Sequence, residues 1–167
     1  MEITLTKGQA SDTVAFCRAD GSGDSFDFPK KGPTPHDAFH YFVERELGMA
    51  KGFWGLVASG VEPGAIQQLA ADAGHASAKR AQVPHASIVE LIQAERLVEC
   101  FEAESWSGAS DDEGIVAMAE SGWASSHVPV PLGVQNRIPA IREQLREFEQ
   151  RWHELAIGGS IELAWEE

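Results

Sequence analysis

Strict alternation of apolar and polar residues marks both ends of the chain. Near the N-terminus it occurs in three short segments that contain ITLT, TVAFCR and FDF, and it returns in the last segment, SIELAWEE. A period of two predicts β-strands with one buried and one polar face. The turn residues DGSG between the second and third segments predict a hairpin. We therefore predict an antiparallel sheet of about four strands, formed by the N-terminal hairpins and the C-terminal strand.

Between the two ends, the apolar residues recur at helical spacing. Thr34 followed by Pro35 predicts a helix that begins with Thr34 as N-cap and runs to about Gly48. A short helix or turn is expected over residues 51–60, and further helices over 63–74, 87–105, 110–122 and 139–155. No internal repeat or composition shift divides the chain, so we predict a single α+β domain over residues 1–167, in which helices cover one face of the sheet.

The helix predicted over 139–155 has the clearest apolar stripe. Its apolar residues recur at alternating spacings of three and four: Ile138, Ile141, Leu145, Phe148, Trp152 and Leu155. This pattern favours a core helix that lies on the sheet. A homodimer seam is the alternative interpretation, although fewer than three heptads fall short of a coiled coil.

Composition excludes several classes of function. The 167 residues carry a net charge of −13, which is the opposite of the basic surface that binds nucleic acid or anionic membranes. The two cysteines, Cys17 and Cys100, lie far apart, which argues against a disulfide framework or a thiolate metal site. No apolar run approaches the roughly 20 residues needed to cross a bilayer, and the N-terminus lacks a signal-peptide pattern. We expect a soluble cytoplasmic protein without nucleic-acid or membrane partners.

The segment HDAFHYFVE contains the strongest candidate for chemistry. His36 and His40 are one helical turn apart and project to the same side, a spacing with which two imidazoles grip one metal ion. HDAFH is similar to the zinc-binding pattern HExxH, with Asp37 in place of the glutamate. The positive end of the helix favours neutral imidazoles, which is the form that binds metal. This hypothesis makes His36, His40 and Glu44 ligands of a divalent metal such as zinc, and Asp37 a catalytic base.

Other interpretations of this segment stay open. The spacing does not fix a third ligand, and four more histidines are available: His75, His85, His127 and His153. A purely structural interpretation makes Asp37 a capping carboxylate, the two histidines hydrogen-bonded residues on the flank of the helix, and Glu44 a solvated residue. A metal-free acid–base site, with His36 or His40 oriented by Asp37 or Glu44, is the third alternative.

The motif GFWG, residues 52–55, places two large aromatic residues between glycines. Phe53 and Trp54 are predicted to be core anchors that close the first helix onto its neighbour. The functional alternative makes them the wall of a pocket beside His36 and His40.

The segment PHDAFHYFVERELGMAKGFWG resembles one found in a small bacterial protein family without an established activity. In that family, the pattern PHDxxHxxVExxLG is followed by GFWG. The matching residues are Pro35, His36, Asp37, His40, Val43, Glu44, Leu47, Gly48 and residues 52–55. The resemblance implies a bacterial, cytosolic protein, and it transfers no catalytic residue.

Two hypotheses of function follow. The first is a soluble protein without catalytic activity, whose histidines are structural and which acts as a homo-oligomeric binding module. The second is a metal-binding protein or metal-dependent hydrolase that uses the pair His36 and His40.

Overall fold

The computed structural model describes residues 1–30, 32–72, 84–108 and 111–166. Four strands form one antiparallel sheet in the order β3-β2-β1-β4. They are β1 (Glu2–Thr6), β2 (Ser11–Cys17), β3 (Gly23–Pro29) and β4 (Ser160–Ala164). The C-terminal strand β4 pairs with β1, with Thr4 opposite Glu162. The predicted sheet, with N-terminal hairpins and a C-terminal strand, is confirmed.

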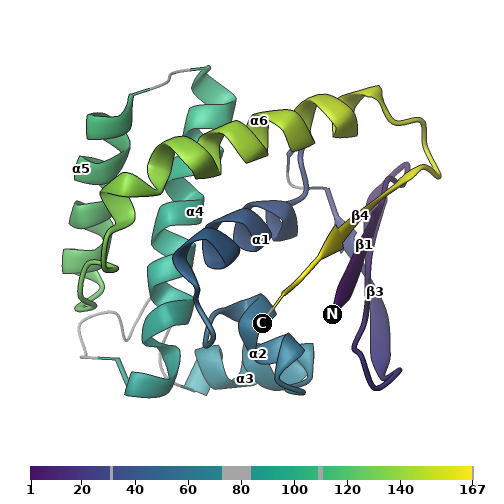
Figure 1. The fold of residues 1–167 in the computed structure, drawn as a ribbon, viewed down its shortest axis with the longest axis horizontal. Helices are drawn as coiled ribbons and strands as arrows, with labels where there is room; N and C mark the ends of the chain where they lie inside the picture. The colour runs from purple at the N-terminus through teal and green to yellow at the C-terminus, as the bar shows by residue number, and fades with distance from the viewer. Residues whose placement is uncertain (31, 73–83, 109–110, 167) are drawn as a thin grey trace.

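Alternation along the strands places their apolar residues on one face. Ile3, Leu5, Val14, Phe16 and Ile161 are all buried, while their neighbours along each strand are more exposed. Figure 1 shows the helices gathered on one side of the sheet. The predicted α+β class is therefore confirmed.

Six α-helices and two short 3₁₀ turns occupy the described residues between β3 and β4. The α-helices are α1 (His36–Leu47), α2 (Phe53–Ala58), α3 (Pro63–Asp72), α4 (Val89–Ser107), α5 (Asp112–Ser125) and α6 (Ile138–Glu154). The 3₁₀ turns are η2 (Ala86–Ile88) and η3 (Val134–Asn136). None of the helices that the structure describes is long and apolar enough to cross a membrane.

Helix α1 begins one residue later than predicted. Pro35, with an extended backbone at φ −61° and ψ 131°, is the N-cap, and His36 is the first helical residue. The Thr34 hydroxyl donates instead to Glu149 on α6. The helix ends at Gly48, whose positive φ of 61° is the left-handed conformation common after a helix.

The apolar stripe of α6 is buried within the chain itself. Ile138, Ile141, Leu145, Phe148 and Trp152 are each at most 3% exposed. The interpretation as a core helix is confirmed. A homodimer stays a prediction, and it requires a surface other than this stripe.

Helix α1 is the central element of the helical layer, in contact with α2, α4 and α6 (Figure 1). Its apolar side chains Phe39, Phe42 and Val43 are buried in the core. The hydroxyl of Tyr41 donates to the carbonyl of Ala164, which ties α1 to the end of β4. These contacts fix the rotation of α1 and turn its histidine edge toward α4.

Candidate metal centre

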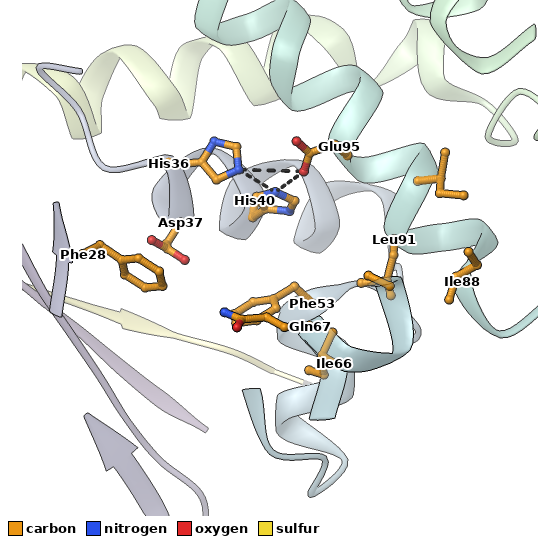
Figure 2. A pocket seen from close by; sticks show the side chains of 12 residues that line it. Phe28, His36, Asp37, His40, Phe53, Ile66, Gln67, Ile88, Leu91 and Glu95 are labelled. Carbon is orange, nitrogen blue, oxygen red and sulfur yellow. Dashed lines mark hydrogen bonds and ion pairs between the residues drawn. The ribbon is translucent and has the colours of Figure 1, made fainter. Parts of the chain in front are cut away.

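The two histidines of α1 face a glutamate of α4. His40 Nε2 lies 3.2 Å from His36 Nε2 and 3.2 Å from Glu95 Oε2, and His36 Nε2 lies 3.8 Å from the same oxygen. Figure 2 shows the three side chains converging between the two helices. Within the described ranges, these three residues form the one group of His, Cys, Asp or Glu side chains with metal-site spacing.

The separations of these three donor atoms suit a transition-metal ion. Bonds of about 2.0 to 2.2 Å in a tetrahedral arrangement place neighbouring donors about 3.3 to 3.5 Å apart. The observed values of 3.2, 3.2 and 3.8 Å lie within a few tenths of an ångström of that range. A small adjustment of side chains is therefore enough to bring all three donors onto one ion.

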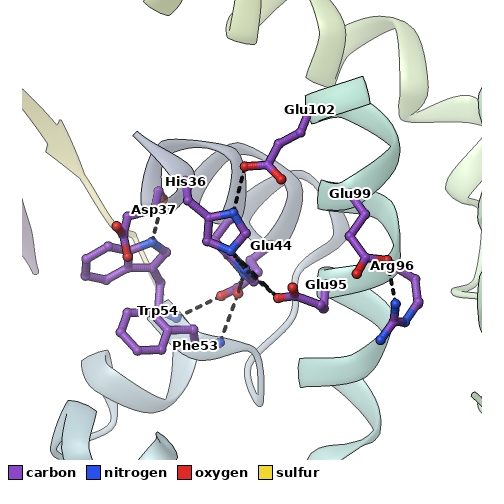
Figure 3. Close-up of polar contacts among 10 residues, drawn as sticks. His36, Asp37, Glu44, Phe53, Trp54, Glu95, Arg96, Glu99 and Glu102 are labelled. Carbon is purple, nitrogen blue, oxygen red and sulfur yellow. Dashed lines mark hydrogen bonds and ion pairs between the residues drawn. The ribbon is translucent and has the colours of Figure 1, made fainter. Parts of the chain in front are cut away.

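The other nitrogen of each imidazole is held by a carboxylate. His36 Nδ1 donates to Glu102 of α4 at 2.8 Å (Figure 3). His40 Nδ1 donates to Glu44 of α1 at 2.9 Å. Because a carboxylate oxygen accepts, the hydrogen of each ring is placed on Nδ1. Both Nε2 atoms face the position between α1 and α4, and both offer lone pairs there once the proton of the metal-free pair has left. Metal-binding histidines are commonly oriented by carboxylates in this way.

Glu44 also joins α1 to α2. The expectation of a solvated Glu44 is wrong, because its side chain is 0% exposed. Its two oxygens accept the backbone N–H groups of Phe53 at 2.9 Å and Trp54 at 2.8 Å. With His40, three donors therefore satisfy a fully buried carboxylate, which offsets the cost of removing it from water. Gly52 makes this approach possible, since a Cβ there would lie 2.5 Å from the Glu44 carboxyl carbon.

The structure assigns Glu44 a different place from the predicted one. We expected Glu44 to be the third ligand, but its carboxylate bonds to Nδ1 of His40 and to backbone amides, away from Nε2. Glu95 takes the third position instead. The predicted ligands His36 and His40 are brought together. His85, His127 and His153 do not join this group. His75 lies outside the described residues.

The remaining predicted residues divide between cavity and core. Asp37 and Phe53 line the cavity beside the histidines. Trp54 is fully buried and is not among the described lining residues; its indole N–H donates to the carbonyl of Asp37 at 3.0 Å. In Figure 2 the Asp37 carboxylate points toward Phe28 and away from Glu95. Phe53 therefore forms a pocket wall as predicted, while Trp54 is a core anchor.

A cavity of about 200 Å³ opens directly onto the three donors. His36, His40 and Glu95 all line it, together with residues of β3, α2, α3, η2 and α4. An ion at this position would be held from one side by protein and would face the cavity on the other.

Electrostatics around the imidazoles are dominated by three carboxylates. Burial lowers the pKa of His36, but hydrogen bonds with Glu102 and Glu95 outweigh it and raise the pKa to about 9. Burial also lowers the pKa of His40, but bonds with Glu44 and Glu95 raise it to about 10. For Glu95, burial acts to raise the pKa, and the two imidazoles outweigh it and hold the pKa well below its usual range.

These shifts correct the expectation of neutral imidazoles in the metal-free protein. The positive end of α1 disfavours protonation of the imidazoles, but the carboxylates of Glu44, Glu95 and Glu102 have the larger effect. The contact between the two Nε2 atoms needs one donor and one acceptor. The metal-free pair therefore holds a proton at its centre, which an incoming cation has to displace.

Sequence reasoning missed Glu95 and Glu102. Both lie on the side of α4 that faces α1, seven residues or two turns apart. A signal for them exists in the sequence. Ile88 and Ile92 begin a series of positions with alternating spacings of four and three, which fall on one side of a helix. Glu95, Glu99 and Glu102 continue this series. Carboxylates that extend an apolar line point to a polar contact at the edge of the core.

Comparisons of the chain with protein families, with curated proteins and with solved structures find no match. The resemblance to the bacterial family stays a prediction. The chemistry of the site is therefore inferred from its geometry alone.

Replacing Gly52 with alanine tests the role of Glu44. The new Cβ would collide with the Glu44 carboxylate, so we expect Gly52→Ala to lower the free energy of unfolding by about 1–3 kcal/mol, as overpacking does. Gly64→Ala, near the start of α3, is the matched control, since a Cβ there meets nothing within 4 Å. Urea denaturation of both variants measures the difference. Equal free energies of unfolding for Gly52→Ala and Gly64→Ala would show that the Glu44 carboxylate moves aside without destabilising the fold, and would contradict this role of Gly52.

The raised histidine pKa values predict how stability depends on pH. Between pH 6.5 and about 9–10, the folded protein keeps a proton that the unfolded chain has lost, so the free energy of unfolding should fall as pH rises. The expected slope is on the order of 1 kcal/mol per pH unit. Urea denaturation of EDTA-treated protein across this range measures it.

Two variants separate this effect from general alkaline destabilisation. His40→Gln removes one member of the pair and should flatten the dependence, whereas His153→Gln, at an exposed position of α6, should keep it. A wild-type protein whose stability is constant or rises over this range would contradict the prediction.

Proposed function

We propose that this protein binds one divalent transition-metal ion through His36 Nε2, His40 Nε2 and a carboxylate oxygen of Glu95. The observation that carries the proposal is the pairing of both Nδ1 atoms with carboxylates while both Nε2 atoms converge on Glu95. Such an arrangement fixes the ring orientation and the tautomer that a metal ion requires.

A structural ion-pair network explains the convergence less well. Such a network is satisfied when each imidazole meets its own carboxylate, as His36 does with Glu102 and His40 does with Glu44. It does not by itself require the two Nε2 atoms to lie 3.2 Å apart, where they can bond to each other only while one of them carries a proton. A metal ion bound by both Nε2 atoms and Glu95 would take the place of that proton.

The donor set favours zinc or iron(II). Two imidazoles and one carboxylate are the protein ligands of many catalytic zinc sites and of mononuclear iron(II) oxygenases. Both kinds of site leave at least one position for water or substrate. We propose zinc as the first metal to test, because its tetrahedral geometry suits the observed separations.

A metal-dependent hydrolase is the second candidate function. The specific observation in its favour is that the three donors line a cavity large enough for a small molecule, so a remaining coordination position would face that cavity. A bound zinc ion lowers the pKa of coordinated water and so supplies hydroxide at neutral pH. Asp37, which lines the same cavity, is the proposed acid–base group, and in this role its carboxylate would have to turn from Phe28 toward the ion.

A cytoplasmic location and the absence of nucleic-acid partners stay part of the proposal, on the grounds of composition and charge. A homo-oligomeric binding module without catalysis remains compatible with a bound metal, because the ion would then be structural.

Zinc titration tests the metal site directly. After removal of metal with EDTA, calorimetry or competition with a chromogenic chelator should show one equivalent of zinc. Glu95→Gln removes a ligand and should weaken binding at least about tenfold. Glu102→Gln removes only the partner of His36 Nδ1 and should weaken it about 10- to 100-fold, as for other groups that orient a ligand.

Glu99→Gln is the matched control for both variants. Glu99 lies on α4 between the other two glutamates, and its carboxylate pairs with Arg96 instead of a histidine. We expect its zinc affinity to equal that of the wild type. Failure of the wild-type protein to bind stoichiometric zinc, iron(II), cobalt or nickel would contradict the proposed function, as would equal affinity in Glu95→Gln.

A further inference from the structure

The cavity at the candidate metal centre has a mostly apolar wall. Its apolar lining comes from β3, α2, α3, η2 and α4: Phe28, Phe53, Ile66, Ala70, Ile88, Leu91 and Ile92. Figure 2 shows several of these side chains arranged below and beside the His40 ring. Polar lining is confined to Gln67, Asp37 and the three metal-site residues. A ligand in this cavity therefore makes contact chiefly through apolar surface.

The charges around the cavity are negative. Among the described lining residues there is no lysine or arginine, while Asp37 and Glu95 are acidic. Glu44 and Glu102 stand directly behind the two histidines. The negative charge of these four carboxylates exceeds the positive charge of a divalent cation. The site therefore disfavours an anionic ligand even when the ion is bound.

The volume of the cavity limits the size of the ligand. An apolar protein cavity of about 150 Å³ accommodates benzene. A cavity of about 200 Å³ therefore suits one six-membered ring, or a branched aliphatic group of similar size, with a short polar group attached.

A second cavity approaches the same centre from a more polar side. His36 and Glu95 line it together with Glu99, Glu102 and Trp106. The ion and its water therefore have a route to the centre that does not cross the apolar cavity. The apolar side is left available for an organic ligand.

We propose that the apolar cavity binds a neutral or cationic small molecule with an apolar body of about one ring, and that a donor atom of this molecule coordinates the ion held by His36, His40 and Glu95. The inference rests on the proposed metal site. It names the class of ligand or substrate that the site takes.

Cobalt-loaded protein provides the test, because the visible absorption of Co²⁺ reports a change of its ligands. Three probes share the same donor ring: imidazole, 4-phenylimidazole and 4-(imidazol-4-yl)benzoate. We expect 4-phenylimidazole to bind at least about tenfold more tightly than imidazole, because its phenyl group is buried in the cavity. The carboxylated probe should bind at least about tenfold more weakly than 4-phenylimidazole.

A cavity-filling variant locates the binding. Ala70 lines the cavity from α3 and is not itself a metal ligand, so in Ala70→Phe the new ring should occupy the cavity and the advantage of 4-phenylimidazole should disappear, while cobalt and imidazole binding persist. Ala117→Phe, at an exposed position of α5, is the control and should behave like the wild type.

The outcomes separate this inference from the proposed function. Cobalt binding with equal affinity for imidazole and 4-phenylimidazole would overturn the ligand class and leave the metal site standing. If 4-phenylimidazole still binds more tightly than imidazole to Ala70→Phe, the proposed ligand class is overturned as well, since the phenyl group of the probe would then bind outside the cavity. A protein that binds no cobalt would overturn the metal site, and this inference with it.

Discussion

The buried carboxylate of Glu44 is the contact on which the rest of the site depends. It receives the backbone N–H groups of Phe53 and Trp54, and it accepts from His40 Nδ1. One ionised group therefore fixes where α2 starts and how the His40 ring is turned. Because an unpaired buried charge costs several kcal/mol, the three donors and the carboxylate hold each other in place. Gly52 is required at the approach, since any side chain there would enter the carboxylate's position.

The fold supplies the second half of the site through α4. The apolar side chains of α1 are buried in the core together with residues of the sheet and α6. The remaining edge of α1, with His36 and His40, lies against α4. Glu95 then meets both Nε2 atoms, and Glu102 holds the other nitrogen of His36. The result is two imidazoles with their Nδ1 atoms occupied and their Nε2 atoms converging, beside an apolar cavity.

Local sequence patterns were sufficient for the architecture. Period-two alternation found the strands, and the stripe ending at Trp152 found the core helix, because burial of one face imposes these periods directly. The spacing of His36 and His40 likewise placed both on one side of α1. The assignment of Glu44 as a ligand failed for a physical reason. Spacing brings it next to His40, but only the path of the chain through residues 52–54 shows that backbone amides occupy its oxygens.

The contribution of α4 could not be derived from spacing, since it depends on tertiary contact. Glu95 lies 55 residues from His40 in the chain, and nothing local relates the two. The same holds for the histidine pKa values, which are governed by carboxylates from two helices, and for the cavity, whose wall is drawn from six elements. Expectations based on α1 alone therefore brought His36 and His40 to one side of the helix and described their electrostatics incorrectly.

Anomalous diffraction from crystals of the zinc-loaded protein, recorded at the zinc edge, locates the bound ion. We predict a single strong peak about 2.0 to 2.2 Å from His36 Nε2, His40 Nε2 and a Glu95 oxygen, with both Nδ1 atoms still bonded to Glu102 and Glu44. An ion bound through Nδ1, or a peak at any other place in the molecule, would contradict this prediction.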